Sequence, residues 1–295
     1  MHKNKGDIIL HIVFIIMAVL CMAPIVLMLA ISFTSESDIM ENGYRFIPES
    51  GYNLEAYKYV LTHFGNIITG YANTIFVTIV TTVLDVTLTA LYAYPMARKD
   101  FPFRKFFSTL VLITLLFGGG LAPSYYVTVR ILHLKNTYTV LVLKGLGLGF
   151  TCFMMRSYYA TNVPYEIIES GKMDGASEWR IFAQLVAPMA VPIYATNALQ
   201  TAIGCWNSYM TNMLYVEDKD KITLQYVMQK ALMEFSYIKG MDETFSSFID
   251  TSVSDVPVEG ARMAMAAIAI GPVIFAYPFF QKFFIKGLSV GAVKG

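Results

Sequence analysis

The sequence predicts an all-α polytopic membrane protein with six transmembrane helices. The 295 residues are 56% hydrophobic and only 15% charged, with a mean hydropathy of +0.53, whereas soluble domains are about 25% charged. Six apolar runs also reach roughly the 20 residues that a helix needs to cross a bilayer. Lysine and arginine gather in alternate connecting segments, as the positive-inside rule requires. These observations together indicate a multi-pass protein.

The six predicted spans are separated by more polar segments throughout the chain. They cover residues 8–32, 71–97, 106–122, 137–155, 187–214 and 261–284. The first run follows two lysines and resembles a secretory signal, but its apolar core is longer than the roughly 7 to 15 residues typical of one, and it lacks an Ala-x-Ala site. We therefore expect it to remain as a spanning helix.

The distribution of charge predicts the orientation. With the N-terminus inside, the short inner segments hold basic residues, and acidic residues collect in outer segments 33–70 and 215–260. Both termini are then cytoplasmic, and so is the loop 159–186. We expect one transmembrane domain over 1–295 with a core of about 70–284. In residues 223–235, apolar and polar residues alternate with the spacing of an amphipathic helix. The outer segments therefore offer a surface for a partner.

No catalytic constellation is visible. The glycine clusters at 117–123 (FGGGLAP) and 144–150 (KGLGLGF) lack the Gly-Lys-Ser/Thr that holds a nucleotide phosphate, so we interpret them as packing positions. The four histidines are scattered, and the three cysteines lie in apolar runs without metal-ligand spacing. We expect no catalytic residue, no metal site, no bound cofactor and no nucleic-acid partner for this chain.

One polar stretch, residues 166–188, differs from the apolar runs around it. Its pattern predicts a short helix over 164–173, a left-handed turn at Gly175 and a second helix that starts at Ser177. Such a short helix is marginal alone, and Gly171 costs about 1 kcal/mol relative to alanine. We expect the small Ser170 and Gly171 to admit another protein's backbone and Glu169 to bind its arginine or lysine. The alternative is a solvated hairpin packed against its own spans.

Two predicted spans carry polar stripes at helical spacing, which makes them candidates for a solute path. The candidate residues are Thr81 and Asp85 in the second span and Asn197, Thr201, Trp206 and Asn207 in the fifth. Sugar hydroxyls need such donors and acceptors, but hydroxyl residues also join packed membrane helices. Asp85 is a functional candidate because ionisable groups are costly in a membrane; a buried pair with Lys144 or an arginine would also satisfy it.

The 166–188 stretch resembles the loop of bacterial ABC importer permeases, in which Glu-Ala-Ala is followed by three residues, Gly, nine residues and Ile-x-Leu-Pro. Glu169, Gly175 and Pro188 fall at the matching positions, and Asp174-Gly175-Ala176 matches carbohydrate-uptake members. Ser170-Gly171 and 185–187 (LVA) depart from the pattern. Residues 277–295 (YPFFQKFFIKGLSVGAVKG) resemble the branch that serves polysaccharide-derived oligosaccharides, although Lys144 stands where that branch more often has proline.

The resemblance implies a type I ABC importer permease fold in a bacterial cell membrane and a non-catalytic role. It implies three kinds of partner: a second homologous permease in a heterodimer, two ATPase subunits that bind ATP and magnesium, and an extracellular solute-binding lipoprotein that delivers an oligosaccharide. The ATPase-coupling residues it implies are Glu169, Ser170, Gly171, Asp174, Gly175 and Ala176. An ion-coupled secondary transporter is the alternative, and only Asp85 would serve it.

Overall fold

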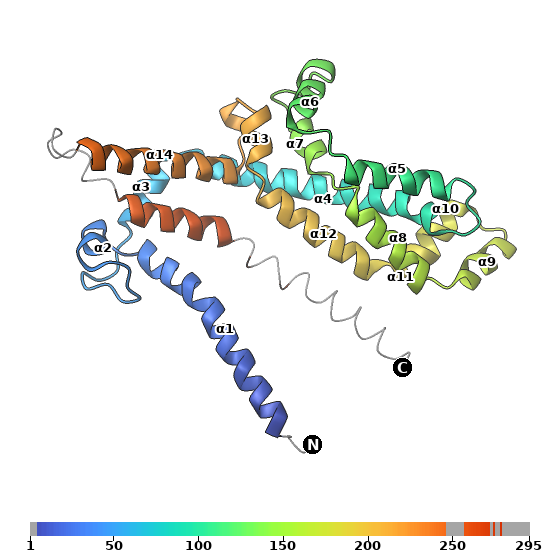
Figure 1. Cartoon of the computed structure of the whole chain (residues 1–295), viewed down its shortest axis with the longest axis horizontal. Helices are drawn as coiled ribbons and strands as arrows, with labels where there is room; N and C mark the ends of the chain where they lie inside the picture. Colours follow the sequence, from blue (N-terminus) through green and yellow to red (C-terminus); the bar gives the residue numbers. More distant parts are fainter. Residues whose placement is uncertain (1–4, 246–256, 272–273, 275–277, 279–295) are drawn as a thin grey trace. The chain divides into compact units, whose positions relative to one another are not determined.

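The computed structural model describes residues 5–245, 257–271, 274 and 278. All regular secondary structure within those residues is helical (Figure 1). The chain divides into two compact units, one of residues 1–68 with 227–272 and one of residues 69–226 with 273–295. Each unit is described by itself.

The first unit contains the N-terminal helix α1 (Lys5–Ser32), and its span agrees with the predicted run 8–32. Apolar side chains all around α1 are exposed, including Ile9, Phe14 and Leu20, each more than 60% exposed. A helix that is apolar on every face needs a nonpolar environment such as lipid. The segment Ile9–Ser32 is long and apolar enough to cross a membrane.

The predicted outer segment 33–70 folds around hydrogen-bonded carboxylates. It contains α2 (Glu36–Asn42) and α3 (Glu55–His63). The Glu36 carboxylate accepts hydrogen bonds from the backbone N–H groups of Glu259 and Gly260, at 3.0 and 3.1 Å, at the start of helical residues 258–271. Hydrogen bonds, chiefly from the backbone N–H of Ser50, lower the pKa of Asp38 to about 2. These hydrogen bonds give the outer segment a defined folded structure.

The predicted amphipathic helix of 223–235 is confirmed by α14 (Leu224–Phe245). Its buried face repeats every three or four residues, as a helix with one packed side requires. That face is formed by Leu224, Val227, Met228, Ala231 and Phe235, whereas Met233 and Tyr237 on the other side are more than half exposed.

The second unit is a bundle of helices of which α4 (Ile67–Ala97) is the longest. In chain order the others are α5 (Arg104–Leu116), α6 (Leu121–Tyr126), the π-helix η1 (Val127–Ile131), α7 (Tyr138–Gly145), α8 (Phe150–Asn162), α9 (Tyr165–Met173), α10 (Glu178–Ile181), the π-helix η2 (Phe182–Val186), α11 (Ala187–Met189), α12 (Val191–Trp206), α13 (Met210–Tyr215) and the 3₁₀-helix η3 (Lys219–Lys221). Within this unit, α9 and α10 lie at the Ala97 end of α4, and α6 and α13 lie toward the opposite end (Figure 1).

Only two described helices are long and apolar enough to cross a membrane without a break, whereas the sequence predicts six continuous spans. They are Ile9–Ser32 and Ile67–Ala97, and three further pairs of helices become spans if each bent pair counts as one. That gives up to five among the described residues. The sixth predicted span, 261–284, is helical over 261–271, and most of its remainder lies outside the described residues.

The predicted span 106–122 is wrong as a single helix because the chain bends by 110° between Leu116 and Leu121. Gly119 and Gly120 have φ of 64° and 81°, which side-chain-bearing residues rarely adopt. A Cβ on Gly118 or Gly119 would meet no atom within 4 Å. Packing within the described part of this chain therefore does not explain Gly118 and Gly119, and the positive φ of Gly119 and Gly120 instead gives the backbone its bend.

The predicted spans 137–155 and 187–214 are also interrupted. The first bends by 50° between α7 and α8, and the second has a 78° bend between Met189 and Val191. Proline supports the second bend, since both α11 and α12 have one at a first-turn position, where its missing N–H costs little. Packing does explain Gly145: a Cβ there would lie 2.7 Å from Thr81 Cγ2 and 2.9 Å from Cys205 Sγ.

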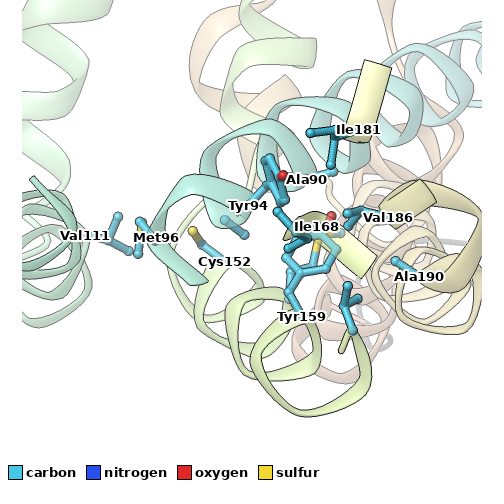
Figure 2. Close-up of a cluster of buried hydrophobic side chains, with 13 residues drawn as sticks. Ala90, Tyr94, Met96, Val111, Cys152, Tyr159, Ile168, Ile181, Val186 and Ala190 are labelled. Atoms are coloured by element: carbon cyan, nitrogen blue, oxygen red, sulfur yellow. The ribbon is translucent and has the colours of Figure 1, made fainter. Parts of the chain in front are cut away.

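One hydrophobic core joins α4 and α8 to the helices that follow them (Figure 2). It includes Ala93 and Met96 from α4 and Met155 from α8, all at most 1% exposed. Ile168 of α9 and Ile181 of α10 enter the same core. Full burial of such a side chain contributes about 2 kcal/mol, so the short helices α9 and α10 are held by their own chain.

Candidate functional site

The polar stretch forms the predicted helix, turn and second helix, which we call the α9–α10 hairpin (residues 165–181). Helix α9 follows Pro164 and ends before Asp174. Gly175 has φ of 74°, in the left-handed region that glycine favours. The Ser177 hydroxyl accepts a hydrogen bond from the Arg180 N–H at 3.4 Å and caps α10. The local sequence signals for this hairpin are therefore confirmed.

The small size of Gly171 is used within the chain, which corrects the expectation that it admits another protein. Gly171 is buried. A Cβ at this position would lie 3.0 Å from Leu185 Cδ1 and 3.1 Å from Ile181 Cγ1. Side chains of α10 and η2 therefore fill the space beside Gly171 in which we expected another protein's backbone.

The outer face of the hairpin is exposed and carries most of the predicted coupling residues. Glu169, Ser170, Asp174 and Gly175 are exposed, and Ala176 is half-buried. The hairpin also has two large, exposed apolar side chains, Met173 at 88% and Trp179 at 65% exposure. Glu169 forms no hydrogen bond or ion pair with any residue that the structure describes. The hairpin thus offers an exposed acidic group and exposed apolar side chains; its coupling role remains a prediction.

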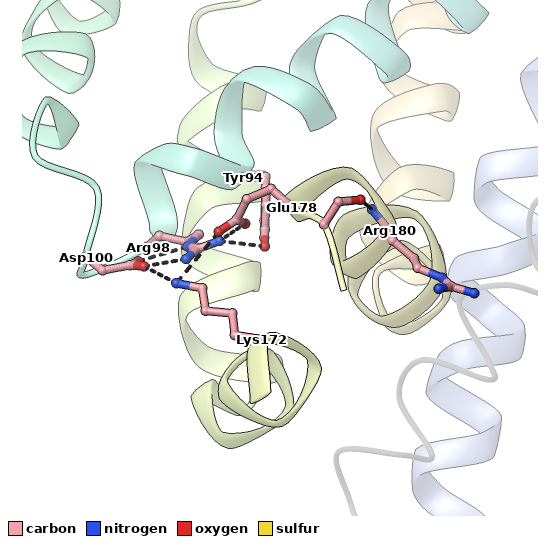
Figure 3. A network of polar contacts seen from close by, with 7 residues as sticks. Tyr94, Arg98, Asp100, Lys172, Glu178 and Arg180 are labelled. Atoms are coloured by element: carbon pink, nitrogen blue, oxygen red, sulfur yellow. Dashed lines mark hydrogen bonds and ion pairs between the residues drawn. The ribbon is translucent and has the colours of Figure 1, made fainter. Parts of the chain in front are cut away.

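A charge network joins the hairpin to the end of α4 (Figure 3). The Arg98 side chain is 8% exposed and donates through Nε to Asp100 Oδ1 at 2.9 Å and through Nη1 to the Tyr94 hydroxyl at 3.2 Å. Arg98 also pairs with Glu178 of α10. Lys172 of α9 donates to Asp100 Oδ2 at 2.7 Å and lies 3.7 Å from Glu178. Two cations and two carboxylates thus connect three elements.

The network stays ionised at neutral pH. Hydrogen bonds from Arg98 hold the pKa of Asp100 well below its usual range, and the hydrogen bond to Asp100 raises the pKa of Lys172. The lowered carboxyl pKa means that this stabilisation is present above the unfolded value of about 3.9 and is lost only when pH falls through the folded value. Sequence reasoning missed the network because its members lie up to 80 residues apart.

A cavity of about 350 Å³ lies at the break between α7 and α8, and we call it the Lys144 cavity. It is lined by Val77, Leu141, Lys144, Gly145, Gly147, Thr151, Gln200, Thr201, Gly204, Cys205, Ser208, Thr211 and Thr223. The polar stripe predicted for the fifth span consists of Asn197, Gln200, Thr201, Gly204, Asn207, Ser208 and Thr211, and all of these except Asn197 and Asn207 line the cavity. The stripe therefore does face a hollow, as a solute path requires.

Asp85 is fully buried near the middle of α4 and is surrounded by neutral donors. Its carboxylate accepts from the Gly147 N–H and the Thr201 hydroxyl, both at 2.7 Å, and from Asn197 Nδ2 at 3.3 Å. It therefore connects α4 to the α7–α8 break and to α12. The alternative of an ion pair with Lys144 is wrong, because Lys144 Nζ donates to Ser124 Oγ at 2.7 Å and lies 5.3 Å from the Tyr215 ring centroid.

The structure brings only some of the predicted path residues together. Asp85, Asn197 and Thr201 form the buried cluster just described, and Thr201 also lines the Lys144 cavity. Thr81 is buried beside Gly145. The remaining two lie elsewhere: Trp206 is buried with its ring 6.2 Å from that of Tyr71, and Asn207 is exposed and donates to the Ile203 carbonyl at 2.9 Å. Their contact with solute remains a prediction.

Within the described part of the chain, no group of three or more His, Cys, Asp or Glu residues is placed to hold a metal ion. The polar clusters there consist of ion pairs and hydroxyl or amide contacts.

Comparison with known proteins gives consistent matches over the whole chain. The family described as binding-protein-dependent transport system inner membrane component matches residues 1–290. The polygalacturonan/rhamnogalacturonan transport system permease protein YtcP of Bacillus subtilis is 32% identical over 99% of this chain and 100% of its own. The arabinooligosaccharides transport system permease protein AraQ of Halalkalibacterium halodurans is 28% identical over 97% of this chain and 96% of its own.

A solved structure has the same fold. It is the crystal structure of a bacterial ABC transporter involved in the import of the acidic polysaccharide alginate, of which one chain superposes with a TM-score of 0.79 at 26% identity, covering 96% of this chain and 99% of that one. The ion-coupled secondary transporter is not supported by any of these matches.

Members of this family are non-catalytic permease subunits of ABC importers; separate ATPase subunits hydrolyse ATP, and a solute-binding protein and a second permease complete the system. With its type I permease fold and full-length matches, the chain belongs to the family of binding-protein-dependent transport system inner membrane components.

Proposed function

We propose that this chain is one of the two membrane-spanning subunits of an ATP-driven importer for a polysaccharide-derived oligosaccharide. The names of the similar proteins support this solute class, because they specify polygalacturonan/rhamnogalacturonan, arabinooligosaccharides and alginate. The hydroxyl and amide lining of the Lys144 cavity suits such a solute, since each sugar hydroxyl that leaves water needs a new partner. An extracellular solute-binding lipoprotein would deliver it.

The assembly that we propose contains a second, homologous permease and two ATPase subunits in a bacterial cell membrane. Both termini and the α9–α10 hairpin then face the cytoplasm, as the basic inner segments predict. ATP and magnesium would be bound by the ATPase subunits and not by this chain. Segments 33–70 and 215–260 would face the binding protein.

The observation that carries the proposal is the exposed hairpin with an unpaired acid. Glu169 is exposed and without an ion-pair partner among the described residues, and Met173 and Trp179 of the same hairpin are exposed as well. A basic residue in an ATPase groove would form a charge-assisted hydrogen bond with Glu169, and the apolar side chains would be buried with it. In this proposal Ser170, Asp174 and Ala176 lie at the edge of that contact, and Gly175 supplies the turn.

The internal contacts of the hairpin support transmission of movement. Ile168 and Ile181 anchor it in the core that contains Met96 of α4. The Arg98 network adds charged bonds from the end of α4 to both hairpin helices. Because close-packed interiors transmit displacement rather than absorbing it, closure of the ATPase dimer on the hairpin would move α4 and α8 with it. Helix α4 also forms one wall of the Lys144 cavity through Val77.

The test is Glu169→Lys in the complete importer. Charged hydrogen bonds contribute about 1.5–3 kcal/mol, and the reversed charge adds repulsion, so we expect at least about a tenfold fall in co-purified ATPase subunits and in uptake-linked ATP hydrolysis. Glu41→Lys makes the same charge change at an exposed position of α2, in an outer segment away from the hairpin, and should leave the amount of co-purified ATPase subunits unchanged. Unchanged coupling in Glu169→Lys would overturn the role of this residue.

A further inference from the structure

Lys144 places a cation on the wall of a cavity whose other lining residues are neutral and about half of them polar. It lies in the last turn of α7, one residue before Gly145, where the span breaks, and it is exposed. The other polar side chains of the cavity are Thr151, Gln200, Thr201, Ser208 and Thr211, with Thr223. A fixed charge at such a depth in a spanning segment is costly and needs a reason.

No carboxylate among the described residues balances this ammonium group. One of its three N–H donors goes to Ser124 Oγ at 2.7 Å, and the Tyr215 ring provides a weaker contact at 5.3 Å. Asp85 contacts the same α7–α8 break through Gly147 but accepts only neutral donors. Lys135, three residues before the start of α7, has its own acid, Glu217 at 2.6 Å. The cation of Lys144 is thus available to a negatively charged ligand.

The remaining lining indicates what kind of anion fits. Hydroxyl and amide groups around one cation match a sugar that carries one carboxylate. The volume of about 350 Å³ is at the small end of the roughly 300–1,000 Å³ range of small-molecule pockets, so the cavity suits a short segment of a glycan. A neutral sugar would leave the ammonium group unpaired on binding, whereas a uronate would neutralise it.

We propose that Lys144 binds the carboxylate of a uronate residue as an acidic oligosaccharide passes through the Lys144 cavity. The inference rests on the proposed function, because it requires that this chain take part in oligosaccharide import. It deepens that function by assigning a charge preference to a residue in the permease, separate from any selectivity of the binding protein.

The experiment uses the complete importer in proteoliposomes with two probes, a galacturonic acid trisaccharide and its methyl ester, which has the same linkages but no charge. Lys144→Met removes the charge and keeps most of the side chain, and Lys144→Arg keeps the charge. We expect Lys144→Met to lower ATP-dependent uptake of the acid about 10- to 100-fold and leave the wild-type-to-variant ratio for the ester near one. Lys144→Arg should retain most uptake of the acid. Lys135→Met, a matched loss of one lysine outside the cavity, should leave uptake of both probes unchanged.

Three outcomes would overturn the inference. One is an equal fall in uptake of acid and ester by Lys144→Met, and another is no fall for either, while the wild type transports. Uptake of the acid by Lys144→Met that matches wild type, with Lys144→Arg impaired, would point to packing instead. Failure of the wild-type importer to move either probe or any other oligosaccharide, with its ATPase subunits bound, would overturn the proposed function itself. The two failures are therefore distinguishable.

Discussion

Two described regions of the unit that contains α4 balance their charged side chains differently. At the end of α4, Arg98 and Lys172 are paired with Asp100 and Glu178. At the α7–α8 break, by contrast, Asp85 accepts from neutral groups and Lys144 donates to a neutral hydroxyl. One region neutralises its charges internally, and the other keeps a cation and an anion apart.

The difference teaches what each region is suited to do. A closed set of ion pairs fixes the relative position of the elements it joins, because separating them exposes unpaired charge. Such a set of ion pairs suits a connection that must transmit movement from the hairpin to α4. An ammonium group whose contacts among the described residues are a hydroxyl and an aromatic ring gains by meeting an anion, so it suits a site that binds and releases a solute. The predictions below test both halves of this contrast.

The largest effect is expected at Arg98, whose side chain is 8% exposed. Arg98→Met removes the shared donor of Asp100, Glu178 and Tyr94 and leaves a half-buried carboxylate at Asp100. Since hydrogen bonds to charged groups contribute about 1.5–3 kcal/mol each, we expect a loss of about 3 kcal/mol in the free energy of unfolding and loss of ATP-coupled uptake. Thermal unfolding in detergent and uptake in proteoliposomes measure the two.

The matched control for Arg98→Met is Arg45→Met. Arg45 forms an ion pair with Glu49 in which both side chains are about half exposed. Exposed pairs of this kind contribute about 0–1 kcal/mol, so the free energy of unfolding should remain near that of the wild type. Equal losses in the two variants would show that the Arg98 network has no special role in holding the hairpin.

A smaller effect is expected at Gly145, where α7 approaches α4 and α12. Gly145→Ala would put a Cβ at 2.7 Å from Thr81 Cγ2 and 2.9 Å from Cys205 Sγ. Overpacking of this kind typically costs about 1–3 kcal/mol. Combination with Thr81→Ser and Cys205→Ala, which remove the opposing atoms, should recover part of the stability measured by thermal unfolding. Gly147→Ala is the control, because a Cβ there meets nothing within 4 Å.

If Gly145→Ala were as stable as Gly147→Ala, close approach at this position would not hold the walls of the Lys144 cavity together. Additional loss in the triple variant, without any recovery, would point instead to the packing value of Thr81 and Cys205 themselves.

Local patterns were sufficient to predict the elements but not their breaks. The hairpin turn follows from Gly175, and the amphipathic face of α14 follows from the spacing between Leu224 and Phe235. The bends at residues 117–120 and 146–149 were missed because an average of hydropathy over about 19 residues takes no account of backbone conformation. Gly119 and Gly120 were the available signal for the first bend, but we interpreted them as packing residues.

For the candidate site, the sequence likewise predicted the position of residues on their own elements but not their contacts with other elements. Glu169 and Asp174 lie on the exposed face that the resemblance indicates, and Thr201 lies on a cavity wall. The use of Gly171 by Ile181 and Leu185, and the joining of Arg98 to Glu178, depend on tertiary contacts. Periodicity assigns a residue to a face of its own helix, but it does not identify the element that covers that face.

The smallest expected effect is the energetic coupling between Asp85 and Lys144. If these residues formed an ion pair, removal of both would cost less than the sum of the single removals by more than about 1 kcal/mol. Asp85 instead has the Gly147 N–H and Thr201 at 2.7 Å, and Lys144 has Ser124 at the same distance. We therefore expect Asp85→Asn and Lys144→Met to combine additively within about 0.5 kcal/mol in thermal unfolding of the solute-free importer. Asp85→Asn alone should be the more destabilising of the two, because an amide NH₂ replaces an acceptor among three donors. A strong coupling would mean that the two charges neutralise each other, and the contrast with the Arg98 network would then disappear.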